Sequence, residues 1–183
     1  MVKVAQSVSP NQESLLVAHL RNTAASAHFE LNELKLCRKE YEISRSIREE
    51  MLPPNDKEVA VILANLGNLE TSEENFDEAR LLFERAVAIR QEIGDSAAIM
   101  LALTYLQIGR IDSLVKDYPS ALKMLQKSEA LFNRQTGARD YLAEYVNSNC
   151  SALYQHCGNS LLDAVSSLPM AISNTLEKTT RKQ

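Results

Sequence analysis

The sequence predicts an all-α solenoid in which pairs of antiparallel helices repeat along the chain. First, the residues around Gly67 recur around Gly109 and, less closely, at the same spacing before Gly67, around Ala25. Second, the composition favours helix over sheet, because 183 residues include only 5 Gly and 5 Pro, and Leu, Ala, Glu, Lys and Arg are plentiful. The period is about 42 residues, a length typical of helical repeats, which bury their apolar faces by stacking on neighbouring units.

Marker positions keep the same kind of side chain from one unit to the next. Small residues stay small at the slots of Gly67, Ala79 and Ala86, and bulky residues stay bulky at the slot of Phe83. The positions that we expect to pack the helices together are Gly67, Phe76, Ala79, Phe83, Ala86, Gly109, Tyr118 and Ala121. Their counterparts in the first unit are Ala25, Leu34, Cys37, Tyr41 and Ser44. A looser fourth match places Leu161 and Leu168 in the slots of Phe76 and Phe83.

Each unit contains two apolar stripes with helical spacing, separated by a short polar turn. In the second unit this turn lies in SEENFDEA (72–79), where Asn75 and Glu78 have the spacing of a capping box. Pro, Gly and Asp recur in the links between units. We therefore predict about eight antiparallel helices, with the following bounds: 11–27, 29–52, 57–72, 75–93, 97–113, 117–135, 139–157 and 160–178.

These elements predict one domain over residues 11–178, which is long enough to bury a core. We expect a flexible N-terminus at 1–10 and a basic tail at 179–183. The four helix pairs are expected at about 18–59, 60–101, 102–144 and 145–178.

The composition argues against several classes of protein. A net charge of −4 and a pI near 5.5 argue against general nucleic-acid binding. No run approaches the roughly 20 apolar residues of a membrane-spanning helix, and the N-terminus shows no apolar export signal. Three Cys without disulfide-type spacing fit a reducing compartment. We expect a cytoplasmic protein that binds neither nucleic acid nor membrane.

The units resemble tetratricopeptide repeats (TPR), whose signature has a Leu-Gly pair followed by an aromatic residue and by Ala, Phe and Ala slots. The matching residues are Leu66, Gly67, Phe76, Ala79, Phe83 and Ala86. The unit is longer than the usual ~34 residues, and its second helix ends in IREE or IRQE. In both respects it resembles the repeats of kinesin light chains and those of signalling ATPases of the NB-ARC kind. The sequence departs from the signature where Glu70 and Asp112 replace the usual Tyr and Lys116 replaces a frequent Gly.

The resemblance implies a right-handed superhelix whose concave groove is lined by the first helix of each pair. The residues expected in this groove are Asn22, Asn65, Asn68, Ser72, Gln107, Arg110 and Asn149. Amide side chains both donate and accept hydrogen bonds, so they can hold the backbone of an extended peptide. The alternative is that these side chains form only the solvated faces of amphipathic helices. Binding of a chaperone's C-terminal carboxylate is not expected, because the slots for the required Lys residues hold Val61, Ala64, Leu103 and Leu106.

Two clusters raise the question of chemistry. Cys150, His156 and Cys157 lie close in sequence, but no Cys-x-x-Cys pair accompanies them, so we expect no metal. The acidic residues of 70–78 are expected at an exposed turn, where acids favour the positive end of a helix. With no phosphate-binding Gly-rich motif either, we expect neither catalysis nor a cofactor.

The sequence therefore predicts a non-catalytic adaptor or scaffold that binds another protein or an extended peptide in its groove. One alternative is self-association through the C-terminal end, where Leu161 and Leu168 lie on an apolar helix without a polar capping helix. Another alternative is a C-terminal sensor fragment of a larger NB-ARC-like signalling protein.

Overall fold

The computed structural model describes residues 10–134, 148 and 151–159, and all regular structure in these residues is helical, as the predicted fold class requires. Six α-helices follow one another: α1 (Pro10–Glu30), α2 (Leu34–Met51), α3 (Lys57–Ser72), α4 (Phe76–Ile93), α5 (Ala98–Leu114) and α6 (Tyr118–Arg134). A short 3₁₀ helix, η1 (Gly94–Ala97), joins α4 to α5. Residues 151–159 are also helical.

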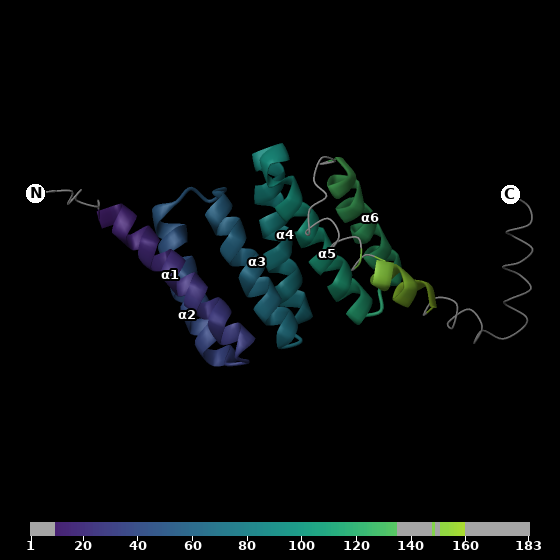
Figure 1. The fold of residues 1–183 in the computed structure, drawn as a ribbon, viewed down its shortest axis with the longest axis horizontal. Coiled ribbons are helices and arrows are strands. Elements are labelled where there is room, and N and C mark those ends of the chain that lie inside the picture. The colour runs from purple at the N-terminus through teal and green to yellow at the C-terminus, as the bar shows by residue number, and fades with distance from the viewer. Residues whose placement is uncertain (1–9, 135–147, 149–150, 160–183) are drawn as a thin grey trace, which may run out of the picture.

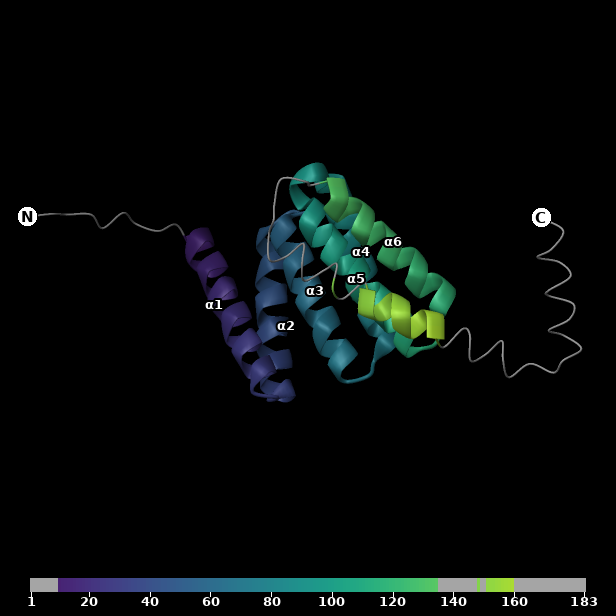
Figure 2. The same cartoon turned by 45° about the vertical axis from the view of Figure 1, so that its right-hand side comes forward.

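The helices form antiparallel pairs that stack in chain order into a solenoid (Figure 1). The closest packing is within the pairs α1–α2, α3–α4 and α5–α6, and the pairs meet where α2 packs on α3 and α4 packs on α5. In the view of Figure 2, α1 again lies at one end of the row. The apolar core is therefore distributed along the stack, within and between the pairs.

The predicted bounds hold to within one residue for α3, α4, α5 and α6. The first break is wrong, because α1 continues to Glu30 and α2 begins only at Leu34, whereas the prediction placed the break near residue 28. The turn between them contains neither Gly nor Pro that could have marked it. The predicted helix at 139–157 is described only from 151 onward apart from residue 148, and the one at 160–178 lies outside the described residues, as does the tail.

The close approach of α3 and α4 depends on a glycine. A Cβ atom on Gly67 would lie 2.9 Å from ring atoms of Phe83, which is closer than carbon atoms can pack. The Phe83 side chain is buried, and Ala79, Ala86 and Ala121 are fully buried in the neighbouring small slots. Phe76 and Tyr118 are half-buried at the starts of their helices. In the third unit the contact is looser, since a Cβ on Gly109 would lie 3.3 Å from the backbone oxygen of Ala121.

The turn inside each of the three pairs has a residue in the left-handed conformation at the same position. Asn32, Glu74 and Lys116 have φ angles of 58°, 63° and 66°, and each is separated from the next by one full repeat. In each turn the backbone N–H of the following residue donates a hydrogen bond to a carbonyl oxygen near the end of the preceding helix, as in the 2.9 Å bond from Asn75 N to Glu70 O. This left-handed closure is typical of helix C-termini. It explains why the resemblance leads one to expect Gly at position 116.

An arginine–carboxylate pair joins the first unit to the second, and another joins the second to the third. Arg38 of α2 bonds Glu70 of α3, and Arg80 of α4 bonds Asp112 of α5, with both members displaced by one repeat. Arg38 also bonds Glu73. The two acids that depart from the TPR signature therefore link adjacent repeats. Glu70 is buried, so the expectation that it lies at an exposed turn is wrong, because its arginine partner is 32 residues away in sequence.

The next step along the stack has no such ion pair. Leu122 and Tyr154 occupy the arginine and acid slots there, and Tyr154 Oη donates to Glu129 Oε2 at 3.0 Å. Tyr154 thus restores the residue type that the family signature has at this slot.

The two arginine–carboxylate pairs differ in the residue that follows each left-handed position. Asn75 makes no side-chain cap for α4, so the predicted capping box is wrong, and its amide donates to Glu70 Oε2 at 2.9 Å. Asp117 holds the same slot in the next unit and cannot donate when ionised. Asp112 Oδ2 consequently has no hydrogen-bond partner among the described residues, although Asp112 is fully buried.

These environments shift the pKa values of Glu70 and Asp112 in opposite directions. The bond from Arg38, with further help from Asn75, lowers the pKa of Glu70 despite its burial. Burial raises the pKa of Asp112 in spite of Arg80, and the nearby charge of Asp117 adds to the increase. The same slot is therefore well satisfied in one unit and poorly satisfied in the next.

Replacing Glu74 or Lys116 by Gly is expected to stabilise the fold, because the left-handed conformation costs an ordinary L-residue about 1–2 kcal/mol. Part of this gain is lost to the added entropy of the unfolded chain, so the free energy of unfolding should rise by about 0.5–1 kcal/mol. Urea titration measures the change. Asn32→Gly is the matched control and should gain less, because Asn tolerates this conformation. Equal gains at all three positions would contradict the explanation.

Glu70→Gln and Asp112→Asn should differ in their dependence on pH. Because the folded-state pKa of Glu70 is lowered, its contribution is present above the unfolded-state pKa of about 4.3 and is lost as pH falls through the folded-state pKa. Asp112 has a raised pKa, so its contribution is present below the unfolded value of about 3.9 and is lost as pH rises through the folded-state pKa.

At pH 7, Glu70→Gln should lower the free energy of unfolding by about 1–3 kcal/mol, and Asp112→Asn should change it by less than about 1 kcal/mol. Denaturant titrations between pH 3 and pH 7 measure both. The deficit of the Glu70 variant should grow with pH, whereas the Asp112 variant should improve relative to wild type. Parallel pH profiles for the two variants would overturn this account of the pairs.

Candidate protein-binding groove

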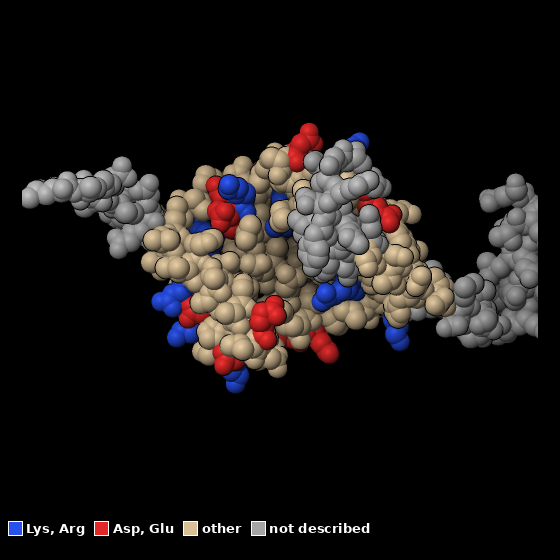
Figure 3. All heavy atoms as spheres, in the orientation of Figure 1, with Lys and Arg blue, Asp and Glu red and all other residues tan. Residues whose placement is uncertain are grey.

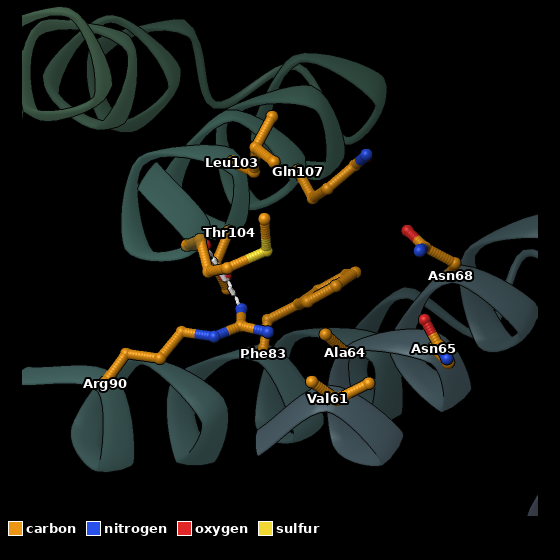
Figure 4. A pocket seen from close by; sticks show the side chains of 10 residues that line it. Val61, Ala64, Asn65, Asn68, Phe83, Arg90, Leu103, Thr104 and Gln107 are labelled. Carbon is orange, nitrogen blue, oxygen red and sulfur yellow. Dashed lines mark hydrogen bonds between the residues drawn. The ribbon is translucent and has the colours of Figure 1, made fainter. Parts of the chain in front are cut away.

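The first helices of neighbouring pairs form the walls of an open groove. One hollow of about 290 Å³ lies between α3, α4 and α5, and a second of about 340 Å³ lies between α1, α2, α3 and α5. Asn65, Asn68 and Gln107 line both hollows, so the two are parts of one groove. Figure 4 shows these three amides at one side of the first hollow, where they point toward the space between α3 and α5.

Helical spacing places the groove residues of α3 on one face. Val61, Asn65, Asn68 and Ser72 follow one another at intervals of three or four residues, which puts them in line along the helix. The opposite face carries the leucines of the core, such as the fully buried Leu63 and Leu69. Burial of the apolar face therefore directs the amides into the groove.

On α5 the same spacing aligns Leu103, Gln107 and Arg110. Leu103 makes the wall apolar at one end, and the exposed Arg110 makes it cationic at the other. Val61, Ala64 and Leu103, at slots where a chaperone-type clamp would need Lys, also line the groove. Apolar side chains at these places cannot neutralise a terminal carboxylate.

The structure brings together most of the residues that the sequence pattern assigned to the groove. Asn65, Asn68, Ser72, Gln107 and Arg110 line it. Asn22 lies beside it and accepts a 2.8 Å hydrogen bond from Asn65 Nδ2, which orients the Asn65 amide. The remaining assigned positions, Asn149, Leu161 and Leu168, lie outside the described residues.

Several lining residues were missed in the sequence. They are Phe29, Glu30, Tyr41, Arg90, Met100 and Thr104. Tyr41 and Arg90 belong to second helices, α2 and α4, which the family resemblance did not assign to the groove. The periodic pattern marks both positions as core slots, and only the packing shows that they also reach the hollows.

Arg90 lies at the inner end of the first hollow, beside Thr104 and Phe83 (Figure 4). Its side chain is almost completely buried. Nη1 donates to the backbone oxygen of Met100 at 3.2 Å and to the Thr104 hydroxyl, and Nη2 donates to the backbone oxygen of Ala60 at 3.3 Å. Burial lowers the pKa of Arg90 to about 10, which leaves the guanidinium charged at neutral pH.

Cys37, Cys157 and His156 serve packing. Cys37 and Cys157 are free and buried, and burial raises the pKa of the Cys37 thiol to about 11. The His156 ring packs edge-on against Tyr118, with centroids 6.3 Å apart. In the described part of the chain, no three His, Cys, Asp or Glu side chains gather as metal ligands would. No helix there has the length and apolar character needed to cross a membrane.

Solved structures share this fold. BtubC (BKLC) from P. vanneervenii is 22% identical with a TM-score of 0.64, and the match covers 73% of this chain and 54% of that one. A putative kinesin light chain with nearly identical TPR-like repeats from Podosopora anserina is 13% identical with a TM-score of 0.63, covering 98% and 82%. The N-terminal domain of stress-induced protein-1 (STI-1) from C. elegans is 17% identical with a TM-score of 0.53, covering 74% and 96%.

At these identities the likeness is one of fold, and the chain spans only about half the length of BtubC. A comparison with curated protein sequences found no match. The sequence profile of the tetratricopeptide repeat matches residues 16–92 and 58–134, and these two ranges together reach into all six helices. The chain therefore belongs to the tetratricopeptide-repeat family, and its repeats are structurally similar to those of the kinesin-light-chain type.

Proposed function

We propose that this chain is a non-catalytic adaptor whose groove binds an extended segment of another protein. Tetratricopeptide repeats generally mediate contacts between proteins. The observation that carries the proposal is the row formed by Asn65, Asn68 and Gln107, which lines both hollows of the groove. Each amide offers a donor and an acceptor to a peptide backbone, whose N–H and C=O groups alternate along an extended chain.

The groove is suited to binding rather than to chemistry. Its described lining residues include no His, Cys or Asp, and Glu30 is their one carboxylate. A nucleophile with a general base within hydrogen-bond reach would need such groups. Between the amides lie apolar surfaces from Val61, Ala64 and Leu103, which can cover side chains of the bound segment.

The setting of the proposed adaptor is the cytoplasm, because the two described cysteines are free thiols and a reducing compartment keeps thiols in that state. The same groove would serve a sensor segment of a larger NB-ARC-like signalling protein, which is the alternative that the sequence analysis raised.

The double variant Asn65→Ala/Arg110→Ala tests the groove. A displayed library of random dodecapeptides is selected on the full chain, and enriched peptides are then measured by fluorescence anisotropy. Losing an amide and a cation from the groove should weaken these peptides by about tenfold or more, because hydrogen bonds contribute ~1 kcal/mol each and charged ones more. The melting temperature should change little, since Asn65 is only half-buried and Arg110 is exposed.

The matched control is Asn55→Ala/Arg45→Ala, which removes the same two residue types outside the groove. Asn55 bonds Glu92, and Arg45 pairs with Glu49 on the surface of α2. This control should bind the peptides as wild type does. If no peptide is enriched, or if both double variants bind equally well, the groove is not the working surface.

Self-association is a second candidate, favoured by the outer face of α1. Val17 and Leu20 are 38% and 59% exposed, whereas Val59 and Ile62, in the same slots of α3, are completely buried against the preceding pair. Figures 1 and 2 show no described helix on the outer side of α1. Two copies of the chain could cover these faces by packing α1 on α1. This end is opposite to the C-terminal end that the sequence analysis favoured.

Leu20→Glu is expected to convert such oligomers to monomers, measured by light scattering after size-exclusion chromatography. A charge on the contact face is unfavourable because it would be buried without a partner. Leu81→Glu is the control, because Leu81 is 62% exposed on α4 and does not lie on the end of the stack. A wild-type chain that is monomeric at high concentration would exclude this second candidate.

A further inference from the structure

A buried arginine occupies the same slot in two successive units. Arg48 ends the apolar stripe of α2 and Arg90 that of α4, one repeat later, and both are almost completely buried. Each donates to a backbone oxygen at the same place in the first helix of its own pair. Arg48 Nη1 bonds Ala18 O at 3.1 Å, and Arg90 Nη2 bonds Ala60 O at 3.3 Å.

The two arginines differ in their counter-ion. The carboxylate of Glu58, at the start of α3, lies 3.5 Å from Arg48 Nη2. The slot of Glu58 in the next unit is occupied by Met100, which has no charge. The hydrogen-bond acceptors of Arg90 are all neutral, two backbone oxygens and one hydroxyl, and among the described residues no carboxylate lies within ion-pair distance.

A buried cation without a counter-ion is unfavourable, since its hydration has been removed and not replaced by an opposite charge. The hollow of about 290 Å³ lies where the missing carboxylate would be: Arg90 and Met100 both line it. Arg48, which has its counter-ion, lines neither hollow of the groove. The change from Glu58 to Met100 thus coincides with the opening of a hollow beside an unpaired guanidinium.

The surrounding charges favour an acidic ligand at this place. Arg110 adds a second cation to the groove, and Glu30 is its one described acid. On the face seen in Figure 3, basic and acidic side chains are interspersed and not separated by sign. A preference for acidic segments would therefore come from the groove itself and not from the surface as a whole, which carries a net charge of −4.

We propose that the bound segment inserts an Asp or Glu side chain into this hollow, where its carboxylate pairs with Arg90 and takes the place that Glu58 has beside Arg48. The proposal rests on the proposed function, because it requires that the groove bind a segment of another protein. The amides of Asn65, Asn68 and Gln107 would hold the backbone on either side of the acidic residue. The ligand class is thus an extended segment with an acidic residue at one fixed position.

Met100→Glu tests the proposal without removing the buried arginine. The new carboxylate stands where Glu58 stands in the preceding unit, so it should pair with Arg90 and exclude the acidic side chain of the ligand. Met100 is 42% exposed, so the core loses little. Leu81→Glu is the control for net charge, because it adds the same charge on an exposed part of α4 outside the groove.

The probe is the displayed library of random dodecapeptides, selected in parallel on wild type and both variants. Wild type and Leu81→Glu should enrich peptides with Asp or Glu at one fixed position, and Met100→Glu should not. For a synthetic peptide selected on wild type, replacing that acid by its amide should raise Kd by roughly tenfold or more, as expected for a charge-assisted pair. The same replacement should change Kd for Met100→Glu by less than about twofold.

The outcomes separate the two ideas. Peptides enriched without a fixed acid, or an acid preference that Met100→Glu retains in full, would overturn the proposed carboxylate pairing with Arg90. The groove would remain a binding surface. A selection that enriches no peptide would overturn both the pairing with Arg90 and the proposed function. Loss of the acid preference in Met100→Glu alone supports the pairing with Arg90.

Discussion

A single helix pair of this repeat type cannot bury all of its apolar surface. The apolar face that stays uncovered has to pack on the neighbouring pair. Val59 and Ile62 of α3 are fully buried because α2 covers them, and Leu101 and Ile108 of α5 are buried beside α4. This constraint places the first helices of successive pairs side by side. Their remaining faces then form the groove, and the first pair keeps an uncovered face at α1.

Polar contacts adjust this stack locally and differ from unit to unit. Buried apolar contacts are tolerant of sequence change as long as size is kept, whereas buried charges need specific partners. The repeats accordingly preserve small and large slots over the three described units but vary their polar residues. Asn75 donates to Glu70, whereas Asp112 has no second donor beside Arg80 among the described residues. Arg48 has a carboxylate partner, and within the same part of the chain Arg90 has none. Such differences make one repeat distinct from another on a common scaffold.

The groove also differs from one repeat to the next, because its polar residues differ. Its amides could hold a peptide backbone of any sequence, which alone would produce a binding surface of low selectivity. Arg90 and Arg110 add charge at two defined places, one buried and one exposed. Because a charge exerts a stronger influence where water is excluded, Arg90 is the better candidate for selectivity and Arg110 for attraction at a distance.

Local sequence patterns were sufficient to predict the period, the all-α class and four of the six described helices to within one residue, because apolar spacing and chain turns are local properties. The family resemblance, carried over position by position, indicated the amides of α3 and α5 that line the groove. The partners of Glu70, Asp112 and Arg90, in contrast, are set by how the pairs stack. The side chains of neighbouring pairs that bond them, Arg38, Arg80 and Thr104, lie 14 to 32 residues away in sequence. No local pattern records which polar groups meet when one pair packs on another.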